Sequence, residues 1–131
     1  MTFSLEAERL LLRWMPPDDA ADLAERRSDP LVAQYQSWIA PYSLAQAQSL
    51  IEAVTAHDEP VIGEWAQPVI VRREDGQTGG DLAVRIGEDG HSAEIGYTLH
   101  RWAWGNGYAT EAAAARVDYL IRDRHVHRVT A

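Results

Sequence analysis

Cysteine is absent from all 131 residues of the chain. This absence excludes a disulfide framework and a thiol nucleophile, and it fits a cytoplasmic protein. The chain also lacks an apolar run long enough to cross a membrane, and Glu6, Glu8 and Arg9 interrupt the segment where a signal peptide would be apolar. We therefore expect a cytoplasmic protein with no membrane partner.

Positive charge is scarce, with 12 Lys and Arg residues against 20 Asp and Glu and a formal net charge of −8. Such a surface repels a nucleic-acid backbone overall, so we expect no nucleic-acid partner and favour cationic acceptors. The basic residues near the C-terminus suit the negative end of a helix dipole: Arg122, Arg124, His125, His127 and Arg128. Since no Cys and no third ligand of recognisable spacing accompany the two histidines, we predict no metal site.

The composition is that of one compact domain covering residues 1–131. The chain is 24% charged and 46% hydrophobic, and it shows neither repeats nor a long linker. In its first half the pattern predicts a strand at 9–14, a helix at 18–28, a helical turn at 31–35 and a helix at 43–57. Asp18 suits the N-cap of the first helix, and Ser43 with Gln46 has the form of a capping box.

The second half predicts three strands, a helix and one further strand, at 65–72, 81–86, 92–99, 109–124 and 126–131. Pro68 cannot donate a ladder hydrogen bond, so an edge position or a bulge is expected there. Gly79-Gly80 and the hairpin turn at 87–90 bracket the second of these strands. One apolar face of the helix should pack on the sheet: Ala109, Ala112, Ala113, Val117, Leu120 and Ile121. The element order is an α+β pattern.

A glycine turn, Gly105-Asn106-Gly107, joins the predicted strand at 92–99 to the predicted helix. Glycine allows a ligand to approach the backbone closely, and the first helical turn offers unpaired N–H groups at the positive end of the helix dipole. This join suits a ligand that carries phosphate. The alternative is that Gly-x-Gly is only a tight turn.

Four segments together resemble the GNAT superfamily of acyl-CoA-dependent N-acyltransferases, in its Rim-type branch: AERLLLRWMPPDDAADLAERRSDP, AEIGYTL, WGNGYATEA and HRVTA. They occur in the family's order and cover nearly the whole chain. The resemblance implies a mixed, mostly antiparallel sheet flanked by helices. It also implies acetyl-CoA as cosubstrate and an amine as acceptor, either a small molecule or a protein N-terminus.

The resemblance also implies where acetyl-CoA binds. The backbone at Tyr97, Thr98 and Leu99 would pair with the pantetheine arm, almost as an added strand. The pyrophosphate would lie in the turn that follows: Ala103, Trp104, Gly105, Asn106, Gly107, Tyr108, Ala109 and Thr110. The family often has Gln or Arg where this chain has Trp102, so Arg101 is the candidate for that charge.

The implied reaction is direct attack of a neutral amine on the acetyl carbonyl. A lysine amine, with a pKa of about 10.4, is neutral in only about one molecule in a thousand at pH 7, so a general base is most useful for such acceptors. Glu94 is the candidate base, and a solvent-facing strand glutamate is the alternative. A backbone N–H near Tyr97 or Thr98 would serve the carbonyl oxygen as it gains charge.

Tyr35, Trp38 and Tyr42 lie where the resemblance places an acceptor-side wall, and Tyr35 and Trp38 are the predicted acceptor-binding residues. The alternative is that these aromatic residues belong to the core or staple a loop. Asp81 could orient the incoming amine, but an Asp after Gly-Gly is commonly turn chemistry, and we leave it outside the predicted site.

The predicted strand at 126–131 stops without a turn or cap, whereas the resemblance implies a further helix and a closing hairpin. We therefore expect a partial domain that lacks the C-terminal strands and helix. The resemblance implies that this missing helix commonly carries a Tyr, which protonates the departing thiolate. A fragment, a truncated gene product and a protomer completed by another chain all stay open. An open sheet edge would favour a homodimer. The functional alternatives are a non-catalytic acyl-CoA-binding protein and an interaction module without coenzyme A binding.

Overall fold

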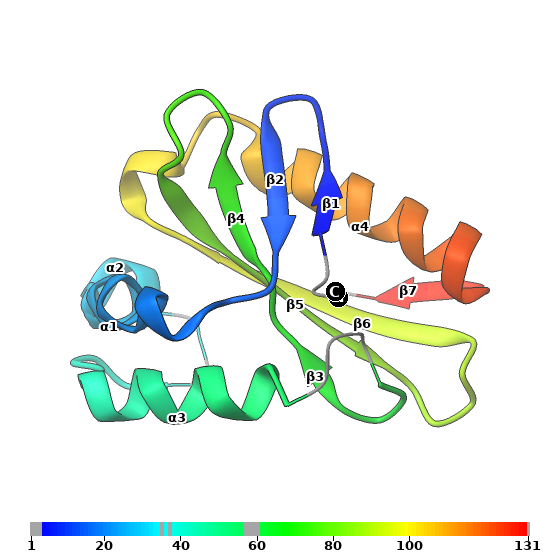
Figure 1. Ribbon diagram of the computed structural model, residues 1–131, viewed down its shortest axis with the longest axis horizontal. Helices are drawn as coiled ribbons and strands as arrows, with labels where there is room; N and C mark the ends of the chain where they lie inside the picture. Colours follow the sequence, from blue (N-terminus) through cyan, green and yellow to red (C-terminus); the bar gives the residue numbers. More distant parts are fainter. Residues whose placement is uncertain (1–3, 35, 37, 57–60, 131) are drawn as a thin grey trace.

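The computed structural model describes residues 4–34, 36, 38–56 and 61–130. Within these residues the chain forms one seven-stranded twisted sheet with helices on both faces (Figure 1). The strands are β1 (Ser4–Glu6), β2 (Leu10–Arg13), β3 (Trp65–Ala66), β4 (Val69–Arg72), β5 (Thr78–Ile86), β6 (Ser92–Leu99) and β7 (Arg128–Thr130). Their order is β1-β2-β4-β5-β6-β7, and β3 pairs with β5. All these pairs are antiparallel except β6 with β7.

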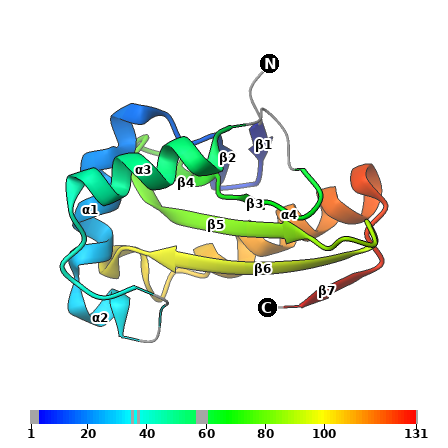
Figure 2. The same cartoon turned by 90° about the horizontal axis from the view of Figure 1, so that it is seen from below.

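The helices form two layers around the sheet (Figures 1 and 2). They are α1 (Ala20–Ser28), α2 (Pro30–Ala33), α3 (Leu44–Val54) and α4 (Tyr108–Arg124), with 3₁₀ turns η1 (Pro17–Asp19) and η2 (Arg101–Ala103). One core cluster joins α1 and α3 to the sheet through Leu23, Ile51 and Val69. A second includes Leu12, Leu82 and Ala112 and joins α4 to the other face. The mixed, mostly antiparallel sheet flanked by helices is the expected arrangement.

The N-terminal predictions fail mainly at the start of the first helix. Asp18 lies inside η1 and α1 begins only at Ala20, so the predicted N-cap is wrong. The helix does end at Ser28, as predicted. The capping box is confirmed: Gln46 N donates to Ser43 Oγ at 3.0 Å, and Ser43 N donates to Gln46 Oε1 at 2.8 Å. The helix ends at Val54, with Thr55 as its C-cap, so the predicted end at 57 is three residues too late.

Two predictions on the central strands need correction. The predicted strand at 65–72 divides at Pro68 into β3 and β4, and β4 lies inside the sheet between β2 and β5. The register shift falls at Ile70/Val71 rather than at the proline. Gly79 and Gly80 do not form a turn but belong to β5, where Gly80 allows a close approach to β6. A Cβ on Gly80 would lie 2.1 Å from the carbonyl oxygen of Thr98.

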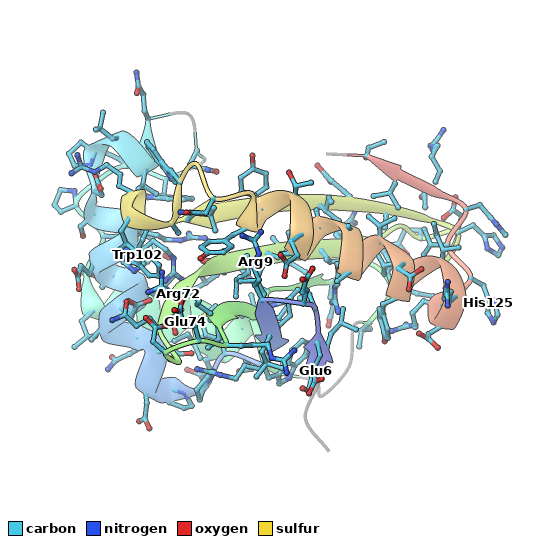
Figure 3. All side chains as sticks on the ribbon, turned by 90° about the horizontal axis from the view of Figure 1, so that it is seen from above. Glu6, Arg9, Arg72, Glu74, Trp102 and His125 are labelled. Atoms are coloured by element: carbon cyan, nitrogen blue, oxygen red, sulfur yellow. The ribbon has the colours of Figure 1, made fainter. Side chains whose placement is uncertain are left out.

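The buried face of α4 also differs from the predicted one. Ala112 and Leu120 are buried as expected, but Ile121 is 51% exposed and Arg116 lies in the buried stripe instead. Burial lowers the pKa of Arg116 to about 10, which leaves the guanidinium charged at neutral pH. Figure 3 shows α4 lying across the sheet from the loop above Arg9 to His125, which closes the helix with a left-handed φ of 57°.

None of the helices in the described part of the chain combines the length and apolarity that a bilayer crossing requires. The same part of the chain contains no group of three or more His, Cys, Asp or Glu side chains placed to hold a metal ion.

Candidate functional site

The predicted strand, glycine turn and helix follow one another in space as they do in the sequence. Gly105 and Gly107 have φ of +77° and +76°, values that side-chain-bearing residues rarely adopt. Helix α4 begins at Tyr108, immediately after the turn, and Glu111 N donates to the Gly107 carbonyl at 3.0 Å. The N–H groups of the first helical turn are therefore offered at the end of β6.

A cleft of about 520 Å³, here called the turn cleft, lies between this turn, β6 and the α2 region. It is lined by ten of the eleven residues predicted to bind the cosubstrate: Tyr97, Thr98, Leu99, Ala103, Trp104, Gly105, Gly107, Tyr108, Ala109 and Thr110. Asn106 is the exception, because its side-chain amide donates to the carbonyls of Ala103 and Trp104 at 3.2 and 3.1 Å. Asn106 thus braces the turn rather than lining the cleft.

The outer backbone edge of β6 is open beside the turn cleft. Strand β7 pairs only with Ser92, Ala93 and Glu94, and among the described residues no strand pairs with this edge of β6 beyond Glu94. Figure 2 shows β7 beside the first part of β6 only. Gln36 makes a long hydrogen bond to the Tyr97 carbonyl there, at 3.5 Å. An extended ligand can therefore hydrogen-bond to the strand as a further strand would.

Arg9 stabilises the glycine turn through contacts with Asn106 and Glu111. This role was not predicted from the sequence. Arg9 Nε donates to Glu111 at 2.6 Å, its backbone N–H to the same carboxylate at 2.7 Å, and its Nη1 to the Asn106 carbonyl at 3.0 Å. Its guanidinium also lies 4.8 Å from the centre of the Tyr108 ring. Burial alone would raise the pKa of Glu111, but the hydrogen bonds from Arg9 outweigh it and lower the pKa overall. The carboxylate therefore stays charged in the first turn of α4.

The residues before the turn serve the fold. Arg101, the candidate for the family's missing charge, donates through Nε to Asp29 at 2.5 Å. Trp102 stacks on the His100 ring, with ring centroids 6.0 Å apart. The guanidinium carbon of Arg72 lies 4.6 Å from the centre of the Trp102 ring (Figure 3). These contacts tie η2 to α2 and to the end of β4.

A second cleft of about 630 Å³, here called the acceptor cleft, opens on the face of the sheet that carries α1 and α3. The two clefts share Gln36, Tyr97 and Thr98, so they meet at the end of β6. A ligand along the strand edge and a second molecule in the acceptor cleft would come together at this junction.

Glu94 and Trp38 both line the acceptor cleft. Glu94 is exposed and lies opposite Arg85 in the register of β5 and β6. Trp38 is half-buried, donates through Nε1 to the Arg27 carbonyl at 2.8 Å and packs edge-on against Tyr42. Trp38 therefore staples its loop to α1 and lines the cleft at the same time. Tyr35, the other predicted acceptor residue, lies outside the described residues.

The interpretation of Asp81 as a turn residue is wrong. Asp81 lies within β5, is 1% exposed and lines the acceptor cleft. Arg26 donates to its carboxylate at 2.7 Å and Gln67 at 2.9 Å. Arg26 comes from α1, 55 positions away, so no local pattern could have indicated this contact.

The buried pair of Arg26 and Asp81 belongs to a larger network that extends to His100. Arg26 also binds Asp22, and the Asp22 carboxylate lies 2.9 Å from His100 Nε2. Burial raises the pKa of Asp22, but the hydrogen bond with His100 and the charge of Arg26 outweigh this effect and lower the pKa overall. The network ties α1 to β5 and to the residue after β6, which fixes the walls of the acceptor cleft.

The mixed sheet, the glycine turn and the two joined clefts together define an acyltransferase fold. Residues 9–131 match the family described as "Acetyltransferase (GNAT) domain". The uncharacterized N-acetyltransferase p20 of Bacillus licheniformis is 33% identical over 130 residues, which are 98% of this chain and 71% of that protein. The chain therefore belongs to the GNAT acetyltransferase family.

Solved structures agree on the fold. A GNAT-family acetyltransferase from Bacillus anthracis superimposes with a TM-score of 0.83 at 22% identity, covering 97% of this chain and 71% of that one. RimL, a ribosomal L7/L12 α-N-protein acetyltransferase, superimposes with a TM-score of 0.78 at 18% identity, covering 98% and 70%. At these identities the likeness establishes the shared architecture, which confirms the GNAT-like fold expected from the sequence.

Proposed function

We propose that this chain carries the site of an acetyl-CoA-dependent N-acetyltransferase of the Rim type that acetylates a primary amine. The observation that carries this proposal is the meeting of the two clefts at Tyr97 and Thr98, beside an open strand edge and a glycine turn. Membership of the GNAT family supports acetyl transfer in general. The similarity in fold to RimL agrees with a protein N-terminus as one acceptor class.

The residues present suit the cosubstrate. Acetyl-CoA supplies an activated thioester, and its pantetheine arm has amide groups that can pair with the open edge of β6 near Tyr97. Its pyrophosphate suits the N–H groups between Gly105 and Thr110, where positive φ values and the helix dipole favour an anion. Arg9 would hold the turn in its binding conformation in the absence of ligand, through its hydrogen bond to the Asn106 carbonyl.

The acceptor amine would enter through the acceptor cleft. Its nitrogen forms a bond to the acetyl carbon, the carbon–sulfur bond breaks, and coenzyme A leaves as its thiolate. Glu94 accepts the proton that the amine must lose, and a backbone N–H near Tyr97 or Thr98 donates to the carbonyl oxygen. The Asp81 carboxylate already accepts hydrogen bonds from Arg26 and Gln67, so it would shape the cleft rather than accept this proton.

Calorimetric titration of the chain with coenzyme A and acetyl-CoA tests the binding half of the proposal. Wild-type protein should bind both, and Gly107→Trp should lose binding because the indole obstructs the turn. Gly76→Trp is the matched control, since Gly76 also has a positive φ, of +74°, but lies in the turn between β4 and β5. Absence of binding in the wild type would contradict the proposal and favour an interaction module.

Turnover tests the other half. Released coenzyme A is measured with a thiol reagent, and the chain contributes no background because it contains no cysteine. A panel of α-amines, lysine-like amines and peptide N-termini should include at least one acceptor. Binding of acetyl-CoA without turnover on any of them would identify a non-catalytic acyl-CoA-binding protein instead.

A further inference from the structure

Arg27 is the one cation among the described residues that line the acceptor cleft. The carboxylates of Glu64, Asp81 and Glu94 line the same cleft. Arg27 comes from the last turn of α1, whereas Glu94 comes from β6, so opposite charges face the cavity from different walls. A cleft with this distribution suits a molecule that carries both signs of charge.

The Arg27 guanidinium is held in place by aromatic rings. It lies 3.9 Å from the centre of the Trp38 ring and 5.1 Å from that of Tyr42. Both rings are fixed to α1, because Trp38 Nε1 donates to the Arg27 carbonyl at 2.8 Å and Tyr42 N donates to Ser28 Oγ at 2.9 Å. Contacts with the ring faces hold the plane of the guanidinium and leave its N–H edge available for a planar anion.

The side-chain Nε of Arg27, unlike its backbone carbonyl, has no hydrogen-bond partner within the described residues, and it is buried there. The neighbouring Arg26 also has a buried, unpartnered Nε, but its charge is balanced by Asp22 and Asp81. No salt bridge to Arg27 occurs among the described residues, so its positive charge remains to be matched there.

We propose that the acceptor amine carries an anionic group, a carboxylate or a phosphate, which binds Arg27. This inference rests on the proposed function and narrows its substrate class. The anion pairs with the guanidinium held by Trp38, and the amine then points toward Glu94 and the junction with the turn cleft. Arg27 is thus a specificity-determining residue that selects zwitterionic amines over simple cations such as polyamines.

Matched pairs of amines test the proposal: phosphoethanolamine with ethanolamine, tyrosine with tyramine, and the peptide amides Ser-Asp and Ser-Asn. Each probe is titrated into the protein saturated with coenzyme A, and turnover with acetyl-CoA is followed in parallel. Wild-type protein should bind at least one anionic member about tenfold more tightly than its partner. The pair that shows the preference distinguishes phosphate from carboxylate recognition.

Three variants assign the effect to one side chain. Arg27→Met should abolish the preference between matched amines, Arg27→Lys should keep part of it, and Arg122→Met on the exposed face of α4 should keep all of it. The affinity for coenzyme A, which reports on the turn cleft, should be unchanged in all three and shows that they are folded. Equal binding of paired probes by the wild type, or a preference that survives Arg27→Met, overturns the proposal even where coenzyme A binds normally.

Discussion

Asp81 and Glu94, two of the three acidic residues that line the acceptor cleft in the described part of the chain, differ in their surroundings. Asp81 is buried and receives hydrogen bonds from Arg26 and Gln67, so its oxygens already have donors. Glu94 is exposed on β6 and faces the cleft. A general base needs an oxygen that is available for the proton it takes, and Glu94 meets this requirement better than Asp81 does.

Glu94→Gln is therefore expected to lower kcat about 100-fold at pH 7 while the KM for acetyl-CoA stays unchanged. The loss should shrink as the pH rises toward the pKa of the acceptor amine, because the amine then deprotonates without help. Glu88→Gln is the control, since Glu88 is a highly exposed glutamate in the turn between β5 and β6. Steady-state kinetics from pH 6 to 10 measure the effect, and an unchanged kcat would show that Glu94 is not the base.

At the scale of elements, the site depends on the close pairing of β5 with β6. Gly80 lies opposite Leu99, and only the absence of a side chain lets the Thr98 carbonyl approach it. The same pairing places Asp81 opposite Thr98 at the junction of the two clefts. Gly96, on β6, has open space where its side chain would be.

Gly80→Ala should lower the free energy of unfolding by about 2 kcal/mol, or the melting temperature by roughly 5–10 °C, because the new methyl group collides with backbone. Gly96→Ala should change the melting temperature little. Thermal unfolding followed by circular dichroism compares the two variants. Equal melting temperatures would mean that the strands separate without cost and that the close approach is unimportant.

At the scale of the whole molecule, the excess of acidic residues is arranged so that several carboxylates stay charged at low pH. The hydrogen bond from Arg72 lowers the pKa of Asp75 to about 2. Asp22 and Glu111 also have lowered pKa values, through His100 and Arg9 respectively. A carboxyl group with a lowered pKa in the folded protein favours folding above its ordinary pKa, and this contribution is lost as the pH falls through the lowered value.

The contribution of these groups to the free energy of unfolding should therefore be nearly independent of pH above about pH 4 and should be lost between about pH 4 and pH 2. Asp75→Asn should weaken this dependence, because the unfolded variant no longer takes up that proton. Urea unfolding at pH 6, 4 and 3 measures the slope, with Glu88→Gln as the control. A slope that is identical in Asp75→Asn and the wild type would contradict the assignment to Asp75.

The sequence by itself determined the features that depend on neighbouring residues. The capping box at Ser43, the strand β6, the turn from Gly105 to Gly107 and the helix after it were all predicted, because each follows from local periodicity, capping or a φ value that favours glycine. Most of the residues predicted to bind the cosubstrate line the turn cleft for the same reason. That part of the site is one continuous stretch of backbone.

Only the tertiary structure decided which distant residues meet. Arg26 and Asp81 are 55 positions apart in the sequence, and the hydrogen-bonded Arg9 and Glu111 are 102 positions apart. The sequence suggests a turn at Gly79-Gly80, because paired glycines are typical of turns. In the structure, glycine is required at position 80 by the Thr98 carbonyl on the neighbouring strand, which the sequence does not reveal. Such contacts exist only once the sheet is assembled, since packing rather than local propensity brings their atoms together.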